Sequence, residues 1–319
     1  MKERSRDKVS SNKFDRRAFI ASAAAGATGI GLALSKQASG SPSPATPRDK
    51  VRWRLQARRT EQSFLDGSTV PFFRYFSVGN TPSNGNLPML KGLAGTEVGV
   101  SVENLLDFPI QPAIRGYDVG PVVMPNQKTI WKFIMPPAGS WMFTESLLGI
   151  VAPAIGLGAP LISFENRLQR RLNTYTLVYQ DADDRWNNAV DSGAAPDESI
   201  FEPNYHTLNG LTYPNTLMDD DTRISCQVGE TVLIRMINLG NIVHSVHLHG
   251  YHAQIVRINN NQNSVFPPKD TFAVPAFSTM DLEMHVDQPG EFPVHPHSLT
   301  STTDNGIYQG GSVTLIDAV

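Results

Sequence analysis

GETVLIRMINL, residues 229–239, decides the fold, because the chain contains this stretch twice in outline. GTEVGVSVENL, residues 95–105, shares its glycine, its alternating β-branched and apolar residues and its closing Asn-Leu at the same offsets. Such alternation has the period of a β-strand. Each copy is followed by a second shared anchor, Pro137–Trp141 in one half and Gln288–Phe292 in the other, which predicts a turn before a late strand. The repeat predicts two homologous β-domains.

The rest of the chain from about residue 51 fits an all-β fold of sandwich type. It has few helix-period segments and many short runs rich in Val, Ile, Phe and Thr, broken by Gly, Pro and Asn. We expect one domain over residues 48–190 and another over 191–319, with residues 192–198 as the loop between them. The strands that we expect include residues 97–103, 129–134, 175–179, 231–237 and 311–316.

Composition and charge indicate which partners are not to be expected. The chain has 319 residues, 40% of them hydrophobic and 18% charged, with a net charge of −3. This charge gives no reason to expect nucleic acid or an anionic membrane as a partner. The single cysteine, Cys226, excludes an internal disulfide and is expected to be a small buried hydrophobic residue.

The N-terminal segment predicts export. A basic stretch precedes Asp15–Ile20, whose Arg-Arg-Ala-Phe-Ile resembles the twin-arginine export motif, and a mildly apolar run follows to Leu34. That run is too short and too rich in glycine to span a bilayer, so we expect no membrane anchor. Residues 1–47 are therefore interpreted as a twin-arginine signal with a flexible linker. The twin-arginine export machinery becomes a partner, and the expected location is periplasmic or secreted.

The histidines are concentrated in VHSVHLHGYH, residues 243–252, which holds four of the eight. Side chains at positions i and i+2 of a strand share a face, so His247 and His249 project together, as do His295 and His297. Each pair supplies half of a copper or zinc site. One pair alone is also compatible with a polar patch, but two pairs in one repeat favour a metal site.

These motifs resemble the multicopper oxidase family. His244–Gly250 is similar to the family's His-Pro-x-His-Leu-His-Gly motif, and His295–His297 is similar to its His-Cys-His motif. Asn209-Gly210 resembles the family's entry into its last domain, and residues 95–162 resemble a first cupredoxin domain. The resemblance covers most of the chain after the signal and is nearest to the two-domain, laccase-like type. It implies copper and two cupredoxin-like Greek-key β-sandwich domains.

Where the family holds its type 1 copper, this chain lacks the ligands. The resemblance places Pro296 at the cysteine, Ser301 at the second histidine and Ile307 at the axial methionine. Only His244 remains of that set. Imidazole alone does not make a blue-copper centre, so we expect no type 1 copper.

The family's trinuclear cluster is also incomplete, because its first domain contributes no histidine. The gapless repeat sets Ala113 and Arg115 opposite the first His-x-His pair. The first domain's other His-x-His position falls on Thr144 and Ser146, while Glu145 between them is expected to be structural. The quartet His247, His249, His295 and His297 remains, and it suffices for one copper ion per chain. We expect His206, His252 and His285 to be structural or on the surface.

The sequence therefore predicts an exported copper oxidoreductase with a reduced copper centre. A small oxidant such as dioxygen and an unidentified reductant would reach the metal directly, since the usual electron entry is missing. A non-enzymatic periplasmic scaffold on the same fold, or a protein that binds metal without turnover, stays open. Two-domain relatives are usually homotrimers, so the resemblance makes a homotrimer plausible.

Overall fold

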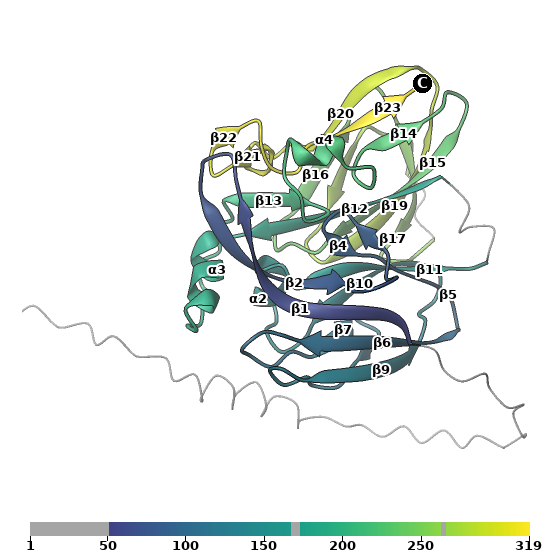
Figure 1. Ribbon diagram of the computed structural model, residues 1–319. Helices are drawn as coiled ribbons and strands as arrows, with labels where there is room; N and C mark the ends of the chain where they lie inside the picture. Colours follow the sequence, from purple (N-terminus) through teal and green to yellow (C-terminus); the bar gives the residue numbers. More distant parts are fainter. Residues whose placement is uncertain (1–50, 167–172, 263–265) are drawn as a thin grey trace, which may run out of the picture.

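A computed structural model describes residues 51–166, 173–262 and 266–319. The predicted signal and linker, residues 1–47, lie outside this part of the chain. Two β-sandwich domains are stacked on one another, the first formed by the earlier half of the chain and the second by the later half (Figure 1). The predicted all-β class is confirmed. In the described part of the chain, no helix is long and apolar enough to cross a membrane.

The first domain contains two main sheets. One has the strand order β2-β1-β6-β9 and the other has the order β5-β11-β10-β7-β8. Their apolar inner faces form a core around buried Trp53, Tyr75 and Phe143. The strand bounds are β1 Val51–Ser63, β2 Thr69–Ser77, β5 Leu90–Leu93, β6 Glu97–Asn104, β7 Pro112–Ile114, β8 Asp118–Val119, β9 Lys128–Ile134, β10 Gly139–Glu145 and β11 Gly158–Phe164.

The second domain repeats this arrangement. Its sheets have the orders β13-β12-β15-β19-β17 and β14-β23-β20-β16-β18. Its core holds Tyr179, Phe272 and Leu282 among others. The strand bounds are β12 Thr174–Ala182, β13 Tyr205–Leu208, β14 Ile224–Cys226, β15 Thr231–Asn238, β16 His244–Leu248, β17 Ala253–Ile258, β18 Thr271–Val274, β19 Ser278–His285, β20 Gly290–Pro296 and β23 Thr314–Ala318.

Small elements connect and flank these sheets. Helix α3 lies against the first domain, where Asn187 donates to the carbonyl of Pro71 at 2.7 Å and Arg59 pairs with Asp191. The bounds of the small elements are β3 Ser83–Asn84, β4 Leu87–Pro88, β21 Thr303–Asp304, β22 Ile307–Tyr308, α2 Val151–Ala154, α3 Asp184–Asp191, α4 Asn215–Met218 and the 3₁₀ helix η3 Thr300–Thr302.

The sequence repeat corresponds to a structural repeat. β6 pairs in parallel with β1 and antiparallel with β9, while β15 pairs in parallel with β12 and antiparallel with β19. After the second anchor, β10 lies between β7 and β11, as β20 lies between β16 and β23. The repeat therefore makes β7 the counterpart of β16, and β10 the counterpart of β20.

Two boundaries differ from those that the sequence predicts. β12 is hydrogen-bonded to β15, so the second domain includes residues from Thr174 onward instead of beginning at 191. The predicted interdomain loop, residues 192–198, consequently lies inside the second domain, between α3 and β13. The last strand begins at Thr314 rather than at 311, because Gly311 has a φ of 64° and belongs to the preceding turn. The other four predicted strands are confirmed.

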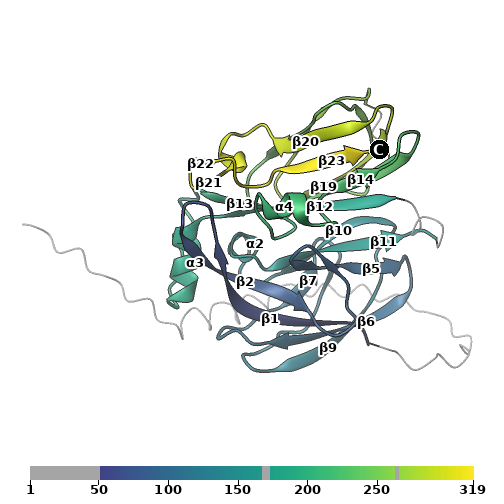
Figure 2. The same cartoon turned by 45° about the horizontal axis from the view of Figure 1, so that its top comes forward.

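The two domains share an interface that is both apolar and polar. Met142, Ile162 and Phe164 of the first domain belong to one buried cluster with Val178, Ile237 and Leu239 of the second. Beside it, the Ser140 hydroxyl donates to Asp281 at 2.5 Å, and Asp281 accepts from Arg235 at 2.7 Å. Figure 2 shows β10 and β12 near this boundary. Ser140 of the first domain thus hydrogen-bonds the buried Arg235–Asp281 ion pair of the second, so a polar contact joins the domains beside the apolar cluster.

Candidate metal centre

Strand β16 divides its side chains between two environments. His244, Val246 and Leu248 are fully buried, whereas His247 and His249 are half-buried on the other face. This follows from the two-residue period of a strand. The structure therefore separates His244 from the other histidines of the motif.

The quartet of His247, His249, His295 and His297 gathers on the outward face of β16 and β20, with His249 and His297 just after the ends of these strands. His247 lies directly opposite His295 in the antiparallel pairing. The ring centroids are 4.5 Å apart for His247 and His249, 4.7 Å for His247 and His297, 5.1 Å for His249 and His295, and 5.8 Å for His295 and His297. The predicted quartet is thus one continuous cluster of imidazoles, and it faces solvent on one side.

Hydrogen-bond partners assign protons to two of these rings. Nδ1 of His295 lies 3.0 Å from the carbonyl oxygen of Pro296, which can only accept. In the neutral ring of His295 the proton therefore lies on Nδ1, and Nε2 is bare. That Nε2 lies 2.9 Å from Nε2 of His249, so His249 is the donor in this contact. Burial, reinforced by the neighbouring His247 and His295, lowers the pKa of His249, which keeps this ring neutral.

The quartet has the donor chemistry that copper prefers, but the ligands are not yet gathered around one point. Imidazole nitrogens suit copper and zinc. In the part of the chain that the structure describes, no group of three His, Cys, Asp or Glu side chains is arranged to hold a metal ion. Within the quartet, Nε2 of His249 and Nε2 of His295 are in hydrogen-bonding contact at 2.9 Å. Because the rings are exposed or half-buried, they can turn about χ2 without disturbing the core, and their donor chemistry suits one copper ion.

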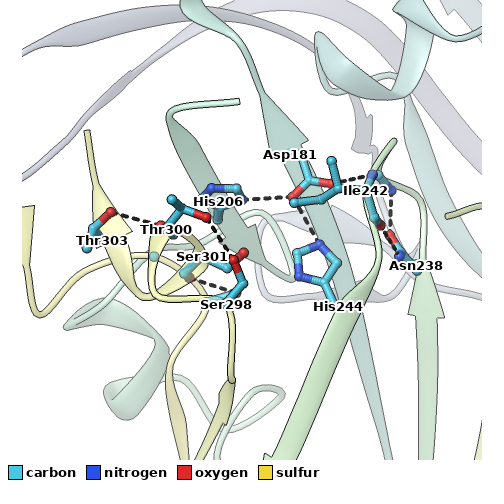
Figure 3. A network of polar contacts seen from close by, with 12 residues as sticks. Asp181, His206, Asn238, Ile242, His244, Ser298, Thr300, Ser301 and Thr303 are labelled. Atoms are coloured by element: carbon cyan, nitrogen blue, oxygen red, sulfur yellow. Dashed lines mark hydrogen bonds and ion pairs between the residues drawn. The ribbon is translucent and has the colours of Figure 1, made fainter. Parts of the chain in front are cut away.

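His244 belongs to a different cluster, in the interior (Figure 3). Its Nε2 lies 3.0 Å from Oδ1 of Asp181, and the same oxygen accepts a hydrogen bond from Nδ1 of His206 at 2.8 Å. All three side chains are fully buried. Burial alone would raise the pKa of Asp181, but the two imidazoles outweigh it and hold this pKa below its ordinary value.

Comparison with known proteins identifies the second domain. Residues 186–310 match the family model described as multicopper oxidase. The second domain is a multicopper oxidase domain. No curated protein sequence matches the chain.

Solved structures extend the likeness to both domains. A blue copper oxidase from Nitrosomonas europaea is 22% identical, with a TM-score of 0.70, and the match covers 83% of this chain and 85% of that one. A copper nitrite reductase from the same organism is 16% identical, with a TM-score of 0.64 and coverage of 83% and 93%. A laccase from Botrytis aclada is 15% identical, with a TM-score of 0.59 and coverage of 83% and 52%. At these identities the likeness shows the fold, which is that of cupredoxin-like multicopper oxidases.

Four positions of this multicopper oxidase domain correspond, by the resemblance, to the ligands of a type 1 copper. Of these four, only His244 has a side chain that can bind copper. Pro296 is buried on the core side of β20, and Ser301 is fully buried in η3. Among the residues that the structure describes, the hydroxyl of Ser301 and Nδ1 of His244 find no hydrogen-bond partner. Ile307 is 47% exposed on β22 and does not belong to this buried site.

The first domain has an open hollow at the positions that correspond to the histidine quartet of the second domain. Ala113, Arg115, Thr144 and Ser146 all line one open hollow of about 650 Å³. β7 and β10 bring them together, since Thr144 lies opposite Ala113. The guanidinium of Arg115 stacks on Phe277 with its carbon 4.2 Å from the ring centroid, so this side chain is engaged by an aromatic residue of the second domain.

Glu145 also lines the hollow, yet its carboxylate is committed to the backbone. It accepts N–H groups of Gln111, Leu147 and Leu148 at 2.7–2.8 Å. Burial raises the pKa of Glu145 against these hydrogen bonds. A carboxylate whose lone pairs are occupied in this way has a structural role, as the sequence predicts.

Three site residues carry no distinctive sequence signal. Asp181 holds His206 and His244, while Thr271 and Asp270 contact His247 from β18 and the residue before it. The sequence indicates a structural role for His206 but not its acidic partner. A polar residue opposite a histidine becomes visible only when strand register is known, and β18 is not among the strands that we predict.

Proposed function

We propose that this protein is a copper-binding oxidoreductase whose copper centre is reduced in size, with fewer copper ions than the multicopper oxidase family holds. One copper ion per chain is held by His247, His249, His295 and His297, and there is no type 1 copper. The observation that carries the proposal is the gathering of four imidazoles on one face, with neighbouring ring centroids 4.5–5.8 Å apart. The multicopper oxidase domain and the copper proteins of similar fold support copper as the metal.

The chain's own residues determine how such a centre is approached. The quartet lies at the surface, with His247 18% exposed and His297 more so. A small oxidant and a reductant can therefore reach this face directly. The Nδ1 atoms of His247 and His295 are hydrogen-bonded to acceptors of the backbone and of Thr271, which leaves the Nε2 atoms of these two rings to bind a metal. A bound copper ion would supply cycling between Cu(II) and Cu(I), which suits imidazole ligation.

Export and assembly are part of this proposal. The basic and apolar segments before residue 48 support a twin-arginine signal and a periplasmic or secreted location. A homotrimer would bring the hollow of one copy close to the quartet of another, as the resemblance implies. Sedimentation of the mature protein measures this directly: a trimer supports that assembly, and a monomer excludes it.

The decisive experiment is elemental analysis of protein exported through its own signal, with an EPR spectrum of the same sample. We expect about one copper per chain, from the number of ligands, with a type 2 signal and no intense blue band. A strong blue band would overturn the absence of type 1 copper. No copper, and none taken up on titration, would overturn the proposal.

A non-enzymatic scaffold is the second candidate, and one observation favours it. Among the described residues, no three metal-ligating side chains are arranged to hold an ion as they stand. A scaffold would retain fold and stability in the quartet variants and show no metal dependence of its partner interactions. Copper uptake without any oxidase turnover would instead indicate metal binding alone.

A further inference from the structure

One row of side chains crosses three strands beside the quartet. Thr271 of β18 lies directly opposite His247 of β16, and His295 of β20 lies opposite His247 on the other side. Nδ1 of His247 lies 3.1 Å from the hydroxyl oxygen of Thr271 and 3.2 Å from the carbonyl oxygen of Asp270. The Thr271 hydroxyl in turn donates to Oδ1 of Asp270 at 3.0 Å.

The hydrogen-bond partners in this row determine where the hydroxyl hydrogen of Thr271 and the ring proton of His247 lie. A threonine hydroxyl has a single hydrogen, and the Asp270 carboxylate, which can only accept, takes it. The Thr271 oxygen therefore presents lone pairs to His247. The Asp270 carbonyl is also an acceptor. Both partners of Nδ1 accept, so in the neutral ring of His247 Nδ1 carries the proton and Nε2 is bare.

Asp270 acts through Thr271 more than through its own charge. The Thr271 hydroxyl donates to Oδ1 of Asp270, and this hydrogen bond keeps the hydroxyl hydrogen turned away from His247. Its other oxygen is 3.9 Å from Nδ1 of His247, and its side chain is 47% exposed. At that exposure water screens the direct attraction, so orienting the Thr271 hydroxyl is the larger effect.

We propose that Thr271 and Asp270 are positioning residues that fix His247 in the tautomer with its proton on Nδ1, so that Nε2 faces the metal. His295 has the same tautomer, set by the Pro296 carbonyl. His249 differs, since its Nε2 donates to His295 and would have to release that proton or move it to Nδ1 before it could bind a metal. His247 is thus a ligand already prepared for copper, a role that rests on the proposed function of the quartet.

The tautomer can be read without metal. Two-bond ¹H–¹⁵N NMR spectra of the metal-free mature chain distinguish a proton on Nδ1 from one on Nε2. We expect His247 in the Nδ1–H form. In Thr271→Val, which keeps the branched shape but removes the oxygen, we expect the Nε2–H form to appear alongside it. Thr271→Ser restores the acceptor and should restore the wild-type spectrum.

The same variants are titrated with Cu²⁺ by calorimetry. Loss of a hydrogen bond to a ligating histidine typically weakens metal binding roughly 10–100-fold, and we expect about tenfold for Thr271→Val because the Asp270 carbonyl remains. Asp270→Ala should weaken binding as well, since the freed hydroxyl can then donate to His247. Thr303→Val is the matched control, because its hydroxyl donates to the Thr300 carbonyl, away from the quartet. Thermal unfolding verifies that every variant folds.

The outcomes separate this inference from the proposed function. An unchanged His247 tautomer and an unchanged copper Kd in Thr271→Val would overturn the positioning role while leaving copper on the quartet. Wild-type protein that takes up no copper would overturn the proposed function. A tautomer change together with weaker copper binding, both reversed by Thr271→Ser, supports the positioning role.

Discussion

The two domains share one framework but present different chemistry at equivalent positions. In the second domain, β16, β20 and the residue after each carry four imidazoles. In the first domain, β7, β10 and the residue after each carry Ala113, Arg115, Thr144 and Ser146 around a hollow. In both domains most of the side chains that point into the core are apolar, and the buried Asp181, His206 and His244 are exceptions. Packing constrains the inward positions of a strand, while the outward positions can change without loss of the fold.

The largest expected difference between the domains is in copper binding. His295→Ala and His247→Ala each remove an imidazole from the centre of the quartet, and we expect both to abolish stoichiometric copper binding. Thr144→Ala and Ser146→Ala change the equivalent positions of the first domain and should leave copper binding unaltered. Copper content by elemental analysis, with circular dichroism to verify folding, tests this contrast. Equal copper loss in the histidine variants and in the first-domain variants would show that the hollow contributes ligands.

A second contrast concerns two glycines that the repeat sets opposite one another. Gly116 and Gly250 have nearly the same backbone, with φ of 70° and 74°. A Cβ at Gly116 meets nothing within 4 Å, but one at Gly250 lies 2.3 Å from the ring of Phe292. Both alanine variants incur the left-handed backbone strain of about 1–2 kcal/mol. Gly250→Ala adds about 1–3 kcal/mol for displacing the ring.

Urea unfolding of the two variants measures this difference. We expect Gly250→Ala to lower the free energy of unfolding by more than Gly116→Ala does. The turn that ends the histidine motif would then be fixed by packing as well as by backbone conformation. Equal losses would mean that Phe292, which is half-buried, moves aside at little energetic cost.

The sequence predicted the fold well because strand alternation and the repeat are local signals. The quartet was predicted for the same reason, since His-x-His on a strand specifies a shared face. The Asp181 cluster was not predicted, because Asp181 and His206 meet His244 only through the pairing of β12 with β13 and their packing against β16. The domain boundary was misplaced because a parallel strand pair has no turn signal, and β12 joins β15 from far along the sequence.

The smallest expected effect concerns the contact between the domains near Asp66. Tyr205 and Asn305 of the second domain donate to Oδ2 of this carboxylate at 2.7 and 3.0 Å. Burial would raise the pKa of Asp66, but these hydrogen bonds and those from Ser68 lower it from 3.8 to about 2. A lowered pKa contributes stability above 3.8 that is lost as the pH falls toward about 2.

Asp66→Asn tests this contribution, because an amide does not titrate. We expect the melting temperature of the variant to fall less steeply than that of the wild type between pH 4 and about pH 2, the interval in which the carboxylate is protonated. The effect should be small, since the carboxylate lies near solvent. Asp197→Asn is the matched control: its carboxylate also has a lowered pKa but bonds only within its own loop, to Ser199. If both variants flatten the curve equally, the interdomain contact has no special part in acid stability.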